Sequence, residues 1–261
     1  MTIFPSIDNA RDLGGTIVPD GRRVRQGLLL RGGALHKASD EDLARLRDEY
    51  HVAAVFDFRT SMEVEHHPDR ELEGARHFWM PAFDENGYTF KNENLPQSAF
   101  QNLGEWLVEH SHEELAQNYA RKMYTEMIDN EFSQIQYAGF LQNIVSTENG
   151  AVYWHCSQGK DRTGVGAALL LAALGCDRKE ILREYLLSED FYRVDFEKYI
   201  SRVETEEEKK VIRTFMSVNP DYFELALDLI DSKYGSMTEF LTGPLCLSSE
   251  DISTLRERYL E

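Results

Sequence analysis

The sequence of 261 residues is poor in cysteine and has no long apolar run. Its three cysteines, Cys156, Cys176 and Cys246, form no C-x-x-C pair, which argues against a disulfide framework and against a zinc or thioredoxin-type site. No apolar run reaches the length of a membrane span, and residues 1–15 lack the cationic and apolar regions of a secretory signal. We therefore expect no stable membrane insertion, a reducing cytoplasmic environment, and structural roles for Cys176 and Cys246.

Basic side chains are also scarce. The 28 Lys and Arg residues are outnumbered by 46 Asp and Glu residues, which gives a formal net charge of −18. Such a chain repels nucleic acid and anionic membranes at long range, so we predict no nucleic-acid partner. A phosphorylated substrate would have to be attracted by a small local cluster of positive charge. Hydrophobic residues make up 42% of the sequence, which is enough for one domain with a sizeable core.

Short apolar segments alternate with helical patterns along the chain. Strands are expected at 27–31, 52–58, 77–80 and 151–155. Four residues precede helical patterns in the manner of an N-cap, namely Ser39, Asp177, Ser236 and Ser248. The alternation predicts an α/β domain with a mostly parallel central sheet wrapped by helices. Residues 84–130 are predicted to contain a helical insertion, and residues 177–261 a helical C-terminal part.

The segment after the last expected strand has the composition of an anion-binding loop. Cys156 follows that strand directly, and Arg162 lies six positions further on. The residues between them are Ser157, Gln158, Gly159, Lys160 and Asp161. A loop of this length can turn successive backbone N–H groups inward, and such a nest binds an anion. We expect a helix to begin near Thr163, so that its positive N-terminal end adds to the site.

The same surroundings favour ionisation of the Cys156 thiol. A cysteine near cations and a helix N-terminus has a pKa well below about 8.5, and the thiolate is the nucleophile that can take a phosphoryl group. Arg162 offers a planar fork for two phosphoryl oxygens, and the Thr163 hydroxyl is close enough in sequence to donate to the sulfur. Lys160 adds a second cation, either to select polyanionic substrates or to lower the pKa of Cys156 further.

The pattern His-Cys-x-x-Gly-Lys-Asp-Arg-Thr-Gly at 155–164 resembles the signature of the protein tyrosine phosphatases, in the form typical of a bacterial and fungal subgroup with dual-specificity and phosphoinositide-like members. The resemblance extends to Asn-x-Arg-Asp-Leu-Gly-Gly at 9–15, to 56–60 with Glu63, and to 185–188. It implies a tyrosine phosphatase-like fold and a phosphocysteine intermediate formed without a cofactor or metal ion. Phosphotyrosine proteins are the implied substrates, with phosphoinositides or other small phosphate esters as the alternative. The helical insertion would then cover the active site as a lid, with ordinary helix packing as the alternative.

Two residues are candidates for the acid that protonates the leaving oxygen. The resemblance implicates Asp161, although a carboxylate between Lys160 and Arg162 could instead serve only to orient the arginine. Asp84 lies where related phosphatases carry an acid loop. We favour Asp161 as the essential residue and keep Asp84 as the alternative.

A catalytically inactive phosphate-binding module is the competing class of function. Such a module usually has a loop damaged at the cysteine, the arginine or the acid, and all three residue types are present here. The sequence therefore favours an enzyme.

Four charged residues outside the loop are expected to form buried pairs that brace it. These pairs are Arg11 with Asp12 and Asp57 with Arg59. A structural role of this kind is expected for them rather than contact with the substrate.

Overall fold

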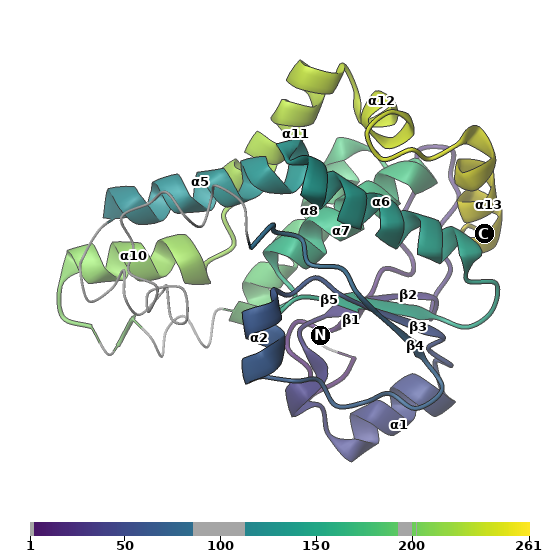
Figure 1. The fold of residues 1–261 in the computed structure, drawn as a ribbon, viewed down its shortest axis with the longest axis horizontal. Coiled ribbons are helices and arrows are strands. Elements are labelled where there is room, and N and C mark those ends of the chain that lie inside the picture. The colour runs from purple at the N-terminus through teal and green to yellow at the C-terminus, as the bar shows by residue number, and fades with distance from the viewer. Residues whose placement is uncertain (1–2, 86–112, 193–199, 202) are drawn as a thin grey trace.

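A five-stranded sheet lies at the centre of the protein (Figure 1), whose computed structural model describes residues 3–85, 113–192, 200–201 and 203–261. The strands lie side by side in the order β1 (Arg11–Asp12), β2 (Leu29–Gly32), β5 (Val152–His155), β3 (Ala54–Asp57) and β4 (Arg76–Trp79). Every neighbouring pair is parallel except β1 with β2, which confirms the predicted mostly parallel sheet. The edge strand β1 is not predicted, because two residues are too few to show an alternating pattern.

The central strand β5 determines where the cysteine loop begins. All four of its residues are buried, and its register places His155 between Gly32 of β2 and Asp57 of β3. The carboxyl ends of these three parallel strands therefore meet at one edge of the sheet. The chain leaves β5 at Cys156, in the region where open α/β sheets bind their ligands.

Helices cover both faces of the sheet (Figure 1). One face carries a smaller core with η1 (Leu35–Lys37) and α1 (Asp40–Asp48). The larger core on the other face is built with α6 (Glu131–Ser146), α7 (Asp161–Leu174), α8 (Arg178–Leu186), α11 (Pro220–Tyr234), α12 (Met237–Thr242) and α13 (Ser249–Tyr259). Short helix α2 (Ser61–His66) follows β3. Helices α5 (Glu113–Asp129) and α10 (Glu206–Met216) pack together and project to one side.

The four predicted N-caps are confirmed, because each side chain accepts a hydrogen bond from the backbone N–H three residues on. They are Ser39 of α1, Asp177 of α8, Ser236 of α12 and Ser248 of α13. Helix α7 begins at Asp161, two residues before the predicted start near Thr163. Its N-cap, Lys160, makes no side-chain capping hydrogen bond, so no local signal marks the start in the sequence.

The predicted insertion at 84–130 is described only in part, since residues 86–112 lie outside the described residues. The later part is helical as predicted and forms α5, whose inner side buries Tyr119, Tyr124 and Met127. The lid function stays a prediction. Among the helices that the structure describes, none combines the length and apolar character needed to cross a bilayer.

Candidate active site

The carbonyl oxygens of the cysteine loop are held by donors that come from outside it. Gln158 O accepts from Tyr192, and Gly159 O accepts from Asn9 Nδ2 at 2.7 Å and from Arg31 Nη2 at 2.8 Å. Ser157 O accepts from the Ala34 backbone at 3.2 Å, and Lys160 O accepts from Arg31 Nη2 at 3.2 Å. In a trans peptide unit the N–H points opposite to the carbonyl group. The amides that follow these carbonyls, at positions 158–161, therefore face the inside of the loop and form a nest for an anion.

Two arginines and a glutamate fix the outer side of this loop. Glu184 accepts from fully buried Arg31 at 2.6 Å and from Arg11 at 2.7 Å. The predicted pair of Arg11 with Asp12 is wrong, because consecutive strand residues point to opposite faces of the sheet. Asp12 instead accepts from the backbone N–H of Gly14 in the following turn and from that of Gly27 just before β2. Arg11 still braces the loop, although it does so through Glu184 and Arg31.

Gly159 is required by its surroundings. Its φ is +68°, and a Cβ atom at this position would lie 2.2 Å from the carbonyl carbon of Gly32. Any side chain would therefore collide with the backbone of β2 as well as strain the turn. The close approach lets the loop lie directly over the end of the sheet.

The Cys156 thiol is buried, with 3% of the residue exposed. Burial alone would raise its pKa, but the Arg162 guanidinium and the Thr163 hydroxyl and backbone N–H hold the pKa below its ordinary value. The Thr163 hydroxyl is fully buried and makes no hydrogen bond among the described residues, so it is available to donate to a thiolate on Cys156. These groups stabilise a thiolate, the reactive form of cysteine.

Arg162 is clamped by Glu63, which comes from α2. Two nitrogens of the guanidinium lie 2.5 and 2.7 Å from the two carboxylate oxygens, and the Ser157 hydroxyl donates to the same carboxylate at 2.5 Å. Burial alone would raise the pKa of Glu63, but Arg162 and Ser157 hold it well below its usual range. The family resemblance includes Glu63, but its pairing with Arg162 is not predicted from the sequence. A local signal is the capping box with Thr60, which fixes Glu63 at the third position of α2.

Lys160 and Asp161 direct their side chains toward the helical side of the loop. Lys160 Nζ donates to Ser217 O at 3.2 Å and lies 3.6 Å from Asp161 Oδ2. Asp161 Oδ1 accepts from the Tyr124 hydroxyl at 2.5 Å. Both residues line a small pocket together with Tyr124 and Tyr185. The second candidate acid, Asp84, is partly buried and follows Phe83.

Asp161 adjoins the loop arginine in the sequence, whereas for Asp84 it is the preceding residue that contacts this arginine. The ring of Phe83 lies 5.6 Å from the Arg162 guanidinium, and Asp161 directly precedes Arg162. One carboxylate oxygen of Asp161 is held by the buried Tyr124.

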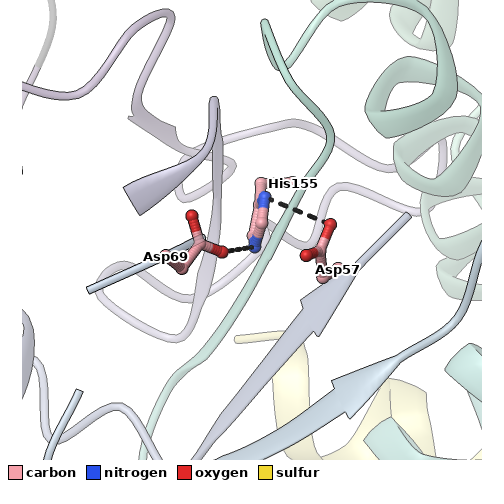
Figure 2. A group of neighbouring side chains, drawn as sticks. All are labelled: Asp57, Asp69 and His155. Carbon is pink, nitrogen blue, oxygen red and sulfur yellow. Dashed lines mark ion pairs between the residues drawn. The ribbon is translucent and has the colours of Figure 1, made fainter. Parts of the chain in front are cut away.

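His155 lies between two carboxylates that the sequence analysis did not group with it. Figure 2 shows the imidazole between Asp57 and Asp69, with one carboxylate at each nitrogen. The nitrogen–oxygen distances are 3.7 Å to Asp57 and 3.1 Å to Asp69. Burial alone would lower the pKa of His155, but the two carboxylates raise it above its ordinary value. A protonated Nδ1 donates to the Cys156 carbonyl oxygen at 3.2 Å, so the cluster holds the start of the loop.

The same three residues offer ligand atoms close enough together for a metal ion. However, Arg59 already lies 2.7 Å from Asp57 and 2.8 Å from Asp69, which confirms the predicted pair of Asp57 with Arg59. The buried guanidinium balances one of the two negative charges and a protonated His155 balances the other, so the cluster is neutral without a metal ion.

The fold and the loop define a class of protein. A family model described as the tyrosine phosphatase family matches residues 3–261, and the chain belongs to this family. It has the α/β fold of the tyrosine phosphatases and is a hydrolase of that type.

Particular relatives agree with this assignment. A protein of Cupriavidus necator, provisionally named a tyrosine-protein phosphatase, is 30% identical over 262 residues, which cover 98% of this chain and 87% of the relative. The triple specificity protein phosphatase PtpB of Mycobacterium tuberculosis is 29% identical over 265 residues, which cover 91% of each chain. A tyrosine-protein phosphatase of Nostoc commune is 45% identical over 56 residues, 22% of this chain and 19% of its own.

Proposed function

We propose that the protein hydrolyses phosphomonoesters, phosphotyrosine first among them, through a phosphocysteine intermediate on Cys156. One observation carries the proposal. Every carbonyl oxygen at positions 157–160 is bound from outside the loop, so the amides turn inward beside a buried thiol whose pKa is lowered. An inward ring of N–H groups beside a thiolate suits a phosphoryl group under nucleophilic attack.

The reaction follows from this geometry in two steps. The Cys156 thiolate attacks phosphorus, and the bond from phosphorus to the leaving oxygen breaks while Asp161 gives that oxygen a proton. The loop amides and Arg162 hold the three equatorial oxygens. A water molecule then attacks the phosphocysteine and gives a proton to the Asp161 carboxylate. The sulfur leaves as a thiolate, which the Thr163 hydroxyl stabilises, and inorganic phosphate is released.

The placement of Lys160 favours phosphotyrosine over a phosphoinositide as the substrate. Its ammonium is engaged by the Ser217 carbonyl oxygen and lies near Asp161, so part of its charge is already compensated. The net charge of −18 also repels anionic membranes. A panel of phosphotyrosine peptides and soluble phosphoinositides tests this choice, and a higher kcat/KM for the phosphoinositides would reverse it. A reducing compartment such as the cytoplasm would keep the thiol active.

Pre-steady-state kinetics with p-nitrophenyl phosphate test the enzyme proposal. We expect a burst of p-nitrophenol that Cys156→Ser abolishes and a chelator does not change. Cys176→Ser is the matched control, because burial raises the pKa of this thiol to about 12 and leaves it unreactive. Absence of turnover across pH 5 to 8 would instead support an inactive phosphate-binding module.

A further inference from the structure

Helix α5 contacts the start of α7 through Tyr124. The residue is 2% exposed, and its hydroxyl lies 2.5 Å from Asp161 Oδ1 and 2.7 Å from the hydroxyl of Tyr185 on α8. The Tyr185 ring stacks on Phe223 of α11 with ring centroids 4.0 Å apart. Asp161 is therefore tied to α5, α8 and α11 by one chain of buried side chains.

The donors and acceptors along this chain have a definite order. Burial raises the pKa of Tyr124 and of Tyr185, so both hydroxyls keep their protons and can donate. An oxygen of Asp161 accepts from Tyr124 and so takes the one proton of that hydroxyl. The Tyr124 oxygen then accepts from Tyr185 at 2.7 Å, a shorter contact than the one of 3.5 Å from Tyr185 to Asn219 O. Hydrogen bonds arranged head to tail in a buried site strengthen one another. The chain fixes the rotation of the Asp161 carboxyl group about its bond to the α7 backbone.

We infer that Tyr124 is a positioning residue for proton transfer by Asp161, an inference that rests on the proposed role of Asp161 as the acid. Because Oδ1 accepts from Tyr124, a proton on Asp161 resides on Oδ2. This oxygen lies 3.6 Å from the Lys160 ammonium, and a nearby cation favours release of the proton to the leaving group. As the bond from phosphorus to the leaving oxygen breaks, that proton moves and Asp161 becomes a carboxylate. The Tyr124 hydrogen bond then stabilises the negative charge, because bonds to charged acceptors are stronger than bonds to neutral ones.

This role makes a side chain of the predicted insertion part of the reaction. Tyr124 belongs to the described helix of that segment, and it contacts the proposed acid rather than only the core. Substrates that need a proton on the leaving oxygen depend on Tyr124, whereas substrates with a stable leaving anion do not.

Leaving-group dependence tests the inference with Tyr124→Phe. The phenolate released from phenyl phosphate is strongly basic and needs the proton, whereas the phenolate from 2,4-dinitrophenyl phosphate is stable without it. We expect kcat/KM for phenyl phosphate, which reports the steps up to cleavage of the ester bond, to fall by about 10- to 100-fold, the effect of losing one hydrogen bond to a charged group. The kcat/KM for dinitrophenyl phosphate stays at the wild-type level. Equal losses on both substrates, or no loss on phenyl phosphate, would overturn the inference.

Two further variants keep the test decisive. Tyr153→Phe is the matched control, because it also removes a buried tyrosine hydroxyl that donates, at 2.6 Å to Gly33 O, and it should leave the ratio of the two rates unchanged. Tyr185→Phe removes the outer donor and should lower the phenyl phosphate rate in the same direction by a smaller factor. If Tyr124→Phe does not fold, the test passes to Tyr185→Phe. A Tyr185→Phe enzyme that shows no selective loss on phenyl phosphate would overturn the inference.

A double-mutant cycle separates this inference from the proposed function. In an Asp161→Asn background Tyr124→Phe should cause no further loss on phenyl phosphate, because the two changes act on one step. A full additional loss would show that Tyr124 acts elsewhere. Turnover of dinitrophenyl phosphate that Cys156→Ser abolishes reports on Cys156 and does not need the acid. Its absence from the wild type would refute the proposed function. Its presence together with an additive cycle would refute only the role of Tyr124.

Discussion

The Glu63 clamp gives the sharpest prediction about stability and activity together. Glu63→Gln keeps the size of the side chain but replaces one carboxylate oxygen by an NH₂ group, which faces the donors of Arg162 instead of accepting from them. The variant therefore loses one of two short hydrogen bonds to the guanidinium, at 2.5 and 2.7 Å, and removes the charge that neutralises Arg162.

The expected cost follows from how buried the pair is. Breaking a fully buried ion pair costs about 3–5 kcal/mol, and a hydrogen bond to a charged group is worth about 1.5–3 kcal/mol. The Arg162 side chain is 13% exposed, but that of Glu63 is 32% exposed, so water screens part of the loss. We expect the free energy of unfolding to fall by about 2 kcal/mol, which is about 30-fold in the equilibrium constant.

Urea denaturation measures this change as a lower midpoint at an unchanged m-value, and steady-state kinetics should show a lower kcat/KM because Arg162 is no longer held in place. Glu65→Gln is the control, since Glu65 is an exposed glutamate on the same helix. The folded pKa of Glu63 is lowered from its unfolded value of 4.5. The difference between wild type and Glu63→Gln should therefore be complete at neutral pH and shrink as the pH falls below about 4.5. An unchanged midpoint together with an unchanged kcat/KM would refute the clamp.

Three further variants probe the loop and its support. Thr163→Val removes the hydroxyl that stabilises the Cys156 thiolate, so the pH profile of Cys156 alkylation by iodoacetamide should move to higher pH; an unmoved profile would contradict this. Gly159→Ala places a Cβ atom against the backbone of β2, and should abolish both activity and phosphate binding. A wild-type phosphate affinity would show that the loop can shift away from β2 and still bind the anion. Asp69→Asn removes one carboxylate that raises the pKa of His155. A histidine with a raised pKa stabilises the fold at pH values below its unfolded pKa, and this stabilisation is lost as the pH rises through the folded pKa. Wild type should therefore exceed Asp69→Asn in free energy of unfolding by more at about pH 6 than at about pH 9. A difference that does not depend on pH would contradict this role of Asp69.

Local features of the sequence predict the fold well. The N-caps and the apolar strands depend on residues a few positions apart, so the pattern that forms them is visible along the chain. The end of α7 at Gly175, with a φ of +98°, follows from a glycine that can adopt the left-handed region. The start of α7 at Asp161 cannot be predicted in this way, because the Lys160 side chain makes no capping hydrogen bond.

The supports of the loop could not be predicted in the same way. Arg11 pairs with Glu184, which is 173 positions away, whereas sequence reasoning assigned it to its neighbour Asp12. Tyr124 shows only the spacing of a buried helix face, and nothing in that spacing reveals that its hydroxyl meets Asp161. Such partners are set by the packing of distant elements, so only the folded chain brings them together.

Rapid acid quenching of the enzyme during turnover of p-nitrophenyl phosphate, followed by mass spectrometry of its peptides, tests the central proposal most directly. We predict a phosphoryl group on the peptide that contains Cys156, formed at the rate of the burst and absent from Cys156→Ser. Turnover with no phosphoryl group on Cys156, or with one on a different residue, would contradict the account.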